Sequence, residues 1–193
     1  MQATFGATPS ELRARAGRRA AGPLLAARLP VRPPYAWAEL AAYLRGRAIA
    51  GVEEVAGDTY RRTVVWGRRP GVITVAPGGP DHLRLEADLA GYEGAIALVA
   101  RVRRMFDCDA EPQVIAAHLG GDPLLARSLR RRPGLRLPSG WDPFEVAVRA
   151  ILGQQVTVAA ATTIAGRFAK ALGDPIDTPH AGLDRLFPPA SRV

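Results

Sequence analysis

Two adjacent glutamines, Gln154 and Gln155, separate two apolar helical patterns in the stretch RAILGQQVTVAAAT, residues 149–162. Short connections between helices are usually filled with Gly, Asn, Asp or Pro. A glutamine side chain donates and accepts hydrogen bonds without carrying a charge. The pair therefore suits a surface that contacts a polar partner. From the residues alone, a plain helix–helix connection is the alternative.

The sequence offers no residue set for a metal site or an activated nucleophile. Cys108 has no second ligand at zinc-binding spacing. The three histidines are far apart along the chain; they are His82, His118 and His180. No phosphate-cradling motif or nucleophile elbow is present. The acidic residues around Cys108 are interpreted as a solvated helix end, since no base pairs with them in the sequence. They are Asp107, Asp109 and Glu111.

The composition is that of a globular chain, with 193 residues of which 48% are hydrophobic and 23% are charged. The net charge of +8 is concentrated at the start, because residues 1–32 hold six arginines and one acidic residue. Such a segment fits a polyanion such as DNA, and a general bias toward arginine is the competing explanation. No apolar run approaches the ~18–20 residues of a membrane span. The start is not a secretory signal, and the single Cys108 excludes an internal disulfide, so we expect a cytoplasmic protein.

The first half of the chain predicts an antiparallel sheet. Residues 1–30 are interpreted as a short helix and a linker rich in Gly and Pro. Residues 35–49 have helical spacing, with Tyr43 and Arg47 neighbouring each other on a face away from the apolar stripe. Residues 51–88 are rich in β-branched residues and are broken by short turns, which indicates a meander.

The second half predicts helices. Over residues 91–107 the apolar spacing places Ile96 and Val99 in one buried stripe. Further helices are expected from Pro112, from Pro123, from Asp142 to Leu152 and from Thr157 to Leu172. The fold class is therefore α+β, an antiparallel sheet with flanking helices followed by an all-helical part.

The segment RPGLRLPSGWDPFEVAVRAILGQQVTVAAATTIAGRFA resembles the beginning of the helix-hairpin-helix DNA glycosylase domain, and in particular the bacterial 3-methyladenine DNA glycosylase II family. VRPPYAWAELAAYLRGRAIAGVEEV and RRMFDCDAEPQVI are similar to the N-terminal domain of that family, and FGATPSELRARA resembles the last helix of an AraC-type DNA-binding domain. The similarity implies three parts: a helix remnant and linker over 1–30, a TATA-binding-protein-like α+β domain over 31–125, and an incomplete helical glycosylase domain over 138–193.

The resemblance also assigns candidate site residues. In that family the turn after the first hairpin helix enters the minor groove of DNA, and a side chain there fills the gap left by the flipped nucleotide. The matching positions are Gln154 and Gln155, with Gly153 and Arg149 as adjoining candidate DNA contacts. Tyr43 matches an aromatic residue of the family's base pocket, and its neighbour Arg47 is included in that candidate pocket.

The resemblance implies hydrolytic excision of alkylated bases, such as 3-methyladenine, from double-stranded DNA by a monomer that flips the base, with water as nucleophile and no cofactor. The family's hairpin motif and catalytic carboxylate are expected beyond Val193. No catalytic residue is therefore assigned within this chain, which is expected to be C-terminally truncated and inactive alone. The alternative function is a non-enzymatic DNA-binding regulator of the alkylation response, because the AraC-like helix leads the chain.

Overall fold

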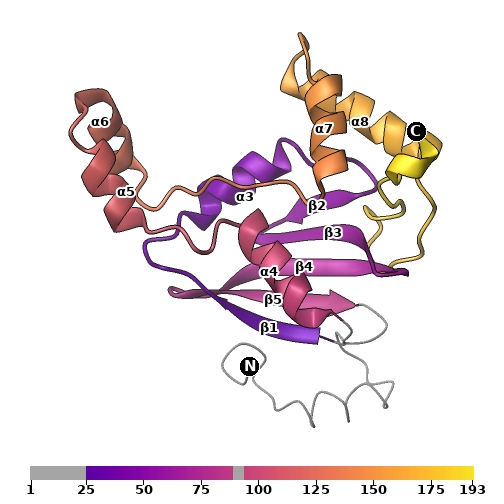
Figure 1. Ribbon diagram of the computed structural model, residues 1–193, viewed down its shortest axis with the longest axis horizontal. Helices are drawn as coiled ribbons and strands as arrows, with labels where there is room; N and C mark the ends of the chain where they lie inside the picture. Colours follow the sequence, from indigo (N-terminus) through magenta and orange to yellow (C-terminus); the bar gives the residue numbers. More distant parts are fainter. Residues whose placement is uncertain (1–24, 89–93) are drawn as a thin grey trace.

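A five-stranded antiparallel sheet forms the centre of the computed structural model, which describes residues 25–88 and 94–193. The strand order is β1-β5-β4-β3-β2. The strands are β1 (Leu25–Pro30), β2 (Glu53–Ala56), β3 (Thr59–Trp66), β4 (Arg69–Gly79) and β5 (His82–Asp88). Strands β2 to β5 follow one another as neighbours, which confirms the meander predicted for residues 51–88 (Figure 1).

Strand β1 corrects the expected boundary at residue 30. It pairs antiparallel with β5 along its whole length and buries every second side chain. The buried residues are Leu25, Ala27 and Leu29. The interpretation of residues 1–30 as remnant and linker is therefore wrong for residues 25–30. The two-residue alternation of LAARLP is a strand signal, but nearby glycine and prolines obscured it. Residues 1–24, including the AraC-like helix, lie outside the described residues.

Helices α3 (Trp37–Arg45) and α4 (Ala95–Met105) cover one face of the sheet (Figure 1). Their buried side chains pack with the inward side chains of the strands in the larger hydrophobic core. The prediction for α4 was wrong at Ile96, which is 65% exposed, while Leu98 and Val99 are buried. The helix presents a narrow stripe to the sheet, and Ile96 lies outside it.

The remaining helices lie at two ends of the sheet (Figure 1). They are α5 (Pro112–Leu119), α6 (Pro123–Arg131), α7 (Pro143–Leu152) and α8 (Val158–Leu172), with the short 3-10 helix η1 (Ala190–Arg192) near the C-terminus. Helices α7 and α8 pack against the sheet domain through a small second core. Its buried members are Ile49, Val52, Ala165 and Ala169. No helix in the described part of the chain is long and apolar enough to cross a membrane.

The acidic residues around Cys108 have partners that their sequence positions did not reveal. Asp109 pairs with Arg103, Glu111 lies 3.3 Å from Arg32, and the Asp107 carboxylate accepts the backbone N–H of Leu137 at 3.0 Å. The cluster is thus bonded to neighbouring segments rather than simply solvated. Cys108 itself is buried, and that burial raises the pKa of its thiol to about 12. The thiol is protonated at neutral pH, a state that makes it unreactive.

Candidate nucleic-acid interface

The turn that carries the two glutamines joins α7 to α8. Helix α7 begins with Asp142 as N-cap, whose carboxylate accepts the N–H of Phe144 at 2.9 Å. The hydroxyl of Thr157 accepts the N–H of Ala160 at 3.2 Å and caps α8, as predicted. Both caps satisfy backbone donors that a helix start leaves free. The two helix boundaries therefore confine the connection to residues 153–157.

The backbone of this turn is strained at one position. Glycine often ends a helix in the left-handed conformation, but the φ of Gly153 is −88°, which any residue adopts. The left-handed conformation falls instead on Gln155, with φ of 58°. Both Gln154 and Gln155 are exposed, so their side chains reach solvent at the apex. A glutamine in the left-handed region costs about 1–2 kcal/mol relative to the usual backbone regions.

Gly153 contributes through close packing. A β-carbon there would lie 3.0 Å from the carbonyl oxygen of Arg149 and 3.8 Å from the β-carbon of Ala161. The first distance is tighter than an ordinary contact, and it is to the last turn of α7 itself, whereas the distance to Ala161 of α8 is an ordinary contact. Glycine thus leaves room for the Arg149 carbonyl at the end of α7.

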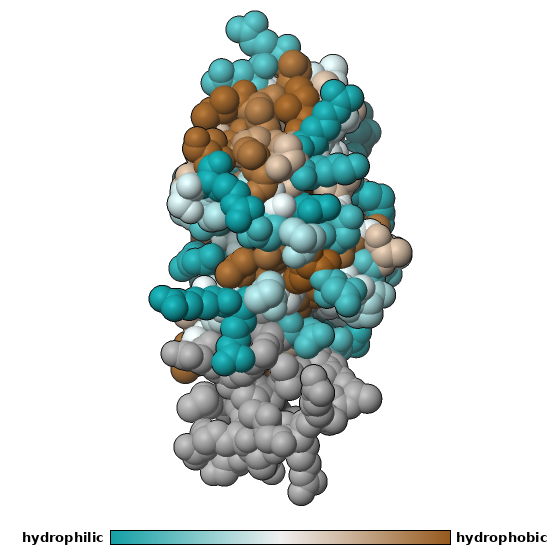
Figure 2. Space-filling view, turned by 90° about the vertical axis from the view of Figure 1, so that its right-hand side faces the viewer, coloured by the Kyte–Doolittle hydropathy of each residue, from teal (hydrophilic) through white to brown (hydrophobic). Residues whose placement is uncertain are grey.

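Apolar side chains flank the glutamines, a feature that the sequence reasoning missed. Ile151 is 65% exposed, Val156 is 43% exposed and Val158 is 47% exposed. Figure 2 views the molecule from the side of α8 and shows apolar residues gathered near the top, over the α7–α8 hairpin. The signal was present in the sequence, where apolar residues precede GQQ and Val156 and Val158 follow it. The turn thus presents both hydrogen-bonding and apolar groups.

A cavity of about 290 Å³ lies beside the turn and brings several candidate residues together. Its walls come from three segments and include Arg47, Ile49, Arg149, Gly153, Val156 and Ala161. Tyr43 is 46% exposed, and the guanidinium carbon of Arg47 lies 3.8 Å from the centre of its ring. The expected neighbourhood of Tyr43 and Arg47 is confirmed. Their role in binding a base stays a prediction.

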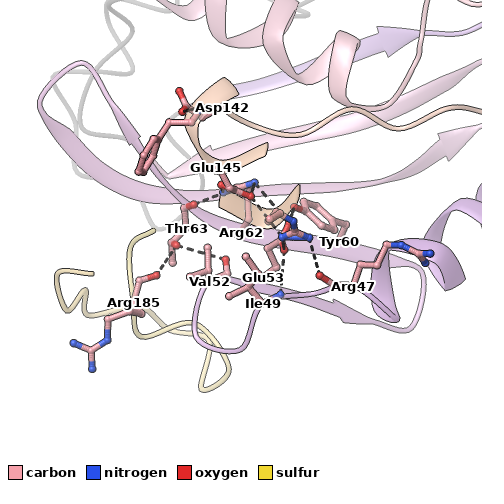
Figure 3. Close-up of polar contacts among 12 residues, drawn as sticks. Arg47, Ile49, Val52, Glu53, Tyr60, Arg62, Thr63, Asp142, Glu145 and Arg185 are labelled. Carbon is pink, nitrogen blue, oxygen red and sulfur yellow. Dashed lines mark hydrogen bonds and ion pairs between the residues drawn. The ribbon is translucent and has the colours of Figure 1, made fainter. Parts of the chain in front are cut away.

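A buried charge network underlies the turn and joins α7 to the sheet (Figure 3). The Glu145 carboxylate lies 2.6 Å from the Arg62 guanidinium, and both side chains are almost fully buried. The Glu53 carboxylate accepts the Tyr60 hydroxyl at 2.7 Å and lies 3.6 Å from Arg62. Two carboxylates and two guanidinium groups, with Arg149 as the second cation, make the network neutral. Glu145 lies in the first turn of α7, and its buried partner Arg62 is 83 residues away in the sequence.

Burial and charge act in opposite directions on this network. Burial alone would lower the pKa of Arg62, but the charge of Glu145, followed by Tyr60 and Glu53, raises it above its usual range. Burial, reinforced by the nearby Glu53 carboxylate, raises the pKa of Tyr60 well above normal. Arg62 thus stays charged and the Tyr60 hydroxyl stays protonated, so it donates to Glu53.

Arg149, a candidate DNA contact, is bonded within the protein. One terminal nitrogen lies 2.8 Å from the Glu53 carboxylate, and the other donates to the backbone carbonyl of Arg47 at 2.8 Å. Glu145 is 3.6 Å away. The side chain is 28% exposed. Its charge is therefore balanced within the protein, which argues against a free phosphate contact.

No group of His, Cys, Asp or Glu side chains that could hold a metal is present within residues 25–88 and 94–193.

The AlkA N-terminal domain family matches residues 26–142, more than half of the chain. The chain belongs to this family. Curated relatives are similar over a larger share of the chain, and the first of them covers enough of it to include the α7–α8 hairpin. A Mycobacterium tuberculosis (strain CDC 1551 / Oshkosh) protein, named as a probable bifunctional transcriptional activator/DNA repair enzyme AlkA, is 40% identical over 188 residues, covering 94% of this chain and 37% of that protein.

The Escherichia coli (strain K12) relative, named DNA-3-methyladenine glycosylase 2, is 40% identical over 147 residues, which cover 75% of this chain and 50% of that protein. This AlkA-family chain thus spans about a third to a half of the length of these relatives. A solved 3-methyladenine DNA glycosylase from Archaeoglobus fulgidus superimposes with a TM-score of 0.70 at 20% identity, over 83% of this chain and 55% of that one. That likeness shows the fold, a mixed α+β arrangement.

Proposed function

We propose that this chain engages duplex DNA as part of an enzyme that excises alkylated bases of the 3-methyladenine type, and that residues 153–157 form its wedge. The observation that carries the proposal is Gln155, an exposed glutamine held in the left-handed conformation at the apex of the turn. Residues other than glycine that are held in the left-handed region are enriched at functional sites. The relatives' names, DNA repair enzyme and DNA-3-methyladenine glycosylase, support the same assignment.

The chemistry of the turn suits a gap in a base stack. Removing a base from the stack costs a few kcal/mol per step, and wedging side chains offset that cost. Val156 can occupy the apolar gap, while Gln154 and Gln155 can hydrogen-bond the orphaned base and the acceptors of the minor groove. Neutral glutamines release no counterions, so this contribution is independent of salt.

The same proposal assigns Tyr43 and Arg47 to the pocket for the extruded base. Arg47 lines the cavity beside the turn and stacks on Tyr43. An aromatic ring that is half exposed offers a flat surface on which a base can stack.

The hydrolytic step needs a carboxylate facing an oxocarbenium-like transition state. The carboxylates beneath the turn do not meet that need, because Glu53 and Glu145 are buried and paired with arginines. We infer that the chain alone binds DNA without cleaving the glycosidic bond. A regulatory role, the alternative function, depends on residues 1–24, which lie outside the described residues.

The test is equilibrium binding of the chain to three DNAs of the same sequence: an intact duplex, a duplex with an abasic-site analogue, and a single strand. An abasic site offers a ready gap, so we expect it to be bound about tenfold tighter than the intact duplex, or ~1.4 kcal/mol. Replacing Gln154 and Gln155 with Ala should remove most of that preference. The control is Gln113→Ala, which removes an exposed glutamine that donates to the Pro33 carbonyl, on α5 at the opposite end of the sheet from the turn (Figure 1).

Incubation of the same preparations with methylated duplex should release no base above a heat-inactivated control. Equal affinity of the parent chain for intact and abasic duplex would contradict the wedge. So would a double variant that keeps the full preference. Release of methylated base would contradict the inference about the carboxylates.

A further inference from the structure

Arg149 connects the glutamine turn to the sheet domain through both its side chain and its backbone. Its carbonyl oxygen accepts the N–H of Gly153 at 3.0 Å, the hydrogen bond that ends α7. Its guanidinium group is held by the Glu53 carboxylate and by the carbonyl of Arg47, each at 2.8 Å. A single residue thus joins the last turn of α7 to the loop between α3 and β2.

Helix α7 has a second anchor at its other end. Glu145, in its first turn, pairs with the fully buried Arg62 of β3. Residues four apart lie on the same face of a helix, so Glu145 and Arg149 both point at the sheet domain. The Glu145 anchor fixes where the helix begins. The Arg149 anchor lies next to the turn, and Arg149 shares the wall of the cavity with Arg47 and Gly153.

We infer that Arg149 is a positioning residue for the wedge: it fixes the position of residues 153–157 relative to Arg47 and Tyr43, and does not itself contact phosphate. This inference rests on the proposed function, because it gives the same turn its support. A wedge fills a gap in the base stack only if its backbone is held in the correct position relative to the DNA. Small displacements of the groups that support such a site weaken it. The ion pair with Glu53 provides that support. A phosphate contact, in contrast, would need a cation that is free to bind the DNA backbone, and such a cation could do so from many positions.

Arg149→Met tests the inference by removing one cation from the neutral network while Glu53 keeps other partners. Glu53 still accepts the Tyr60 hydroxyl and the N–H of Ile49, and Arg62 remains 3.6 Å away. The methionine keeps much of the apolar stem. We therefore expect the variant to fold, and its thermal unfolding is measured alongside binding.

The expected result is a loss of selectivity. The preference of the chain for the abasic duplex over the intact duplex should fall about fivefold, while affinity for the intact duplex and its salt dependence stay within about twofold of the parent. Arg149→Lys keeps the charge but has one nitrogen in place of the two that hold Glu53 and the Arg47 carbonyl, so it should restore only part of the preference. Arg84→Met is the matched control for the loss of one charge, because Arg84 pairs with Glu86 on the open face of the sheet.

A double-mutant comparison separates positioning from general stability. If Arg149 acts through the glutamines, then Arg149→Met added to the Gln154→Ala/Gln155→Ala chain should change the preference no further. A uniform loss of affinity for both duplexes, with the salt slope reduced by about 1, would make Arg149 a phosphate contact and overturn the inference.

Two other outcomes also overturn the inference about Arg149. One is a further loss of the preference for abasic duplex in the triple variant. The other is an Arg149→Met chain that does not fold while the Arg149→Lys chain folds and binds as the parent does. The proposed function fails separately. It fails if the parent has no preference for the abasic duplex or if the glutamine variant keeps it, whatever Arg149 does.

Discussion

Replacing Gln155 with glycine should make the chain more stable and less selective for damaged DNA at the same time. The φ of 58° at Gln155 costs a residue with a β-carbon about 1–2 kcal/mol. Glycine avoids that cost but loses roughly 0.5–1 kcal/mol more conformational entropy on folding. Because the Gln155 side chain is exposed, its removal sacrifices little packing. The net gain in the free energy of unfolding should therefore be about 0.5–1 kcal/mol.

Urea denaturation gives the change in unfolding free energy, and a rise in Tm of roughly 1–4 °C should accompany it at this chain length. The matched control is Gln154→Gly, since Gln154 is not in the left-handed region and should lose about 0.5–1 kcal/mol. The preference for abasic duplex should fall in the Gln155→Gly chain in spite of its added stability. The reasoning would be refuted if glycine at 155 destabilised the chain as much as glycine at 154, or if selectivity were retained.

Two further substitutions test the anchoring of α7 and the placement of Tyr43. Glu145→Ala leaves the buried Arg62 with only the more distant Glu53, and should lower the free energy of unfolding by about 3 kcal/mol; Asp174→Ala, which breaks an exposed pair with Arg192, should cost less than ~1 kcal/mol in the same urea titration. Tyr43→Ala should also cost less than about 1 kcal/mol, the range of an exposed cation–π contact. A thermal-unfolding loss of ~3–5 kcal/mol would instead place that ring in the core.

The sequence predicted the elements whose signals are local. Asp142 and Thr157 are helix caps because a short polar side chain there reaches the backbone N–H groups of the first turn, and both caps are present. The meander followed from short turns between β-branched runs. The exposed glutamine turn followed from two helical patterns that stop and restart within a few residues. None of these features depends on a partner far along the chain.

The features that sequence could not predict depend on distant partners. Strand β1 pairs with β5, some 55 residues later in the chain. The alternation of buried and exposed side chains in β1 indicates a strand only once that partner is known. The position of Glu145 suggests a surface acid near a helix N-terminus, where acids are favourable. Only the fold shows that Arg62 approaches it. Arg149 likewise appeared free because Glu53, its partner, is 96 residues away.

The buried network holds α7 in place, and the proposed wedge at residues 153–157 depends on that support. Taking charges out of water is costly, and an apolar contact in place of a buried ion pair often stabilises a fold equally well. Ion pairs differ from apolar contacts in that they fix direction. Glu145 and Arg149 sit one helical turn apart, and each meets an opposite charge on the sheet domain, so α7 can neither rotate nor slide without separating charges. Only a few residues of the turn extend beyond Arg149, and they are exposed, with the backbone strained at Gln155. The two ion pairs keep the base of this turn rigid. The proposed wedge requires such rigidity, since a turn that yields to the base stack cannot hold it open.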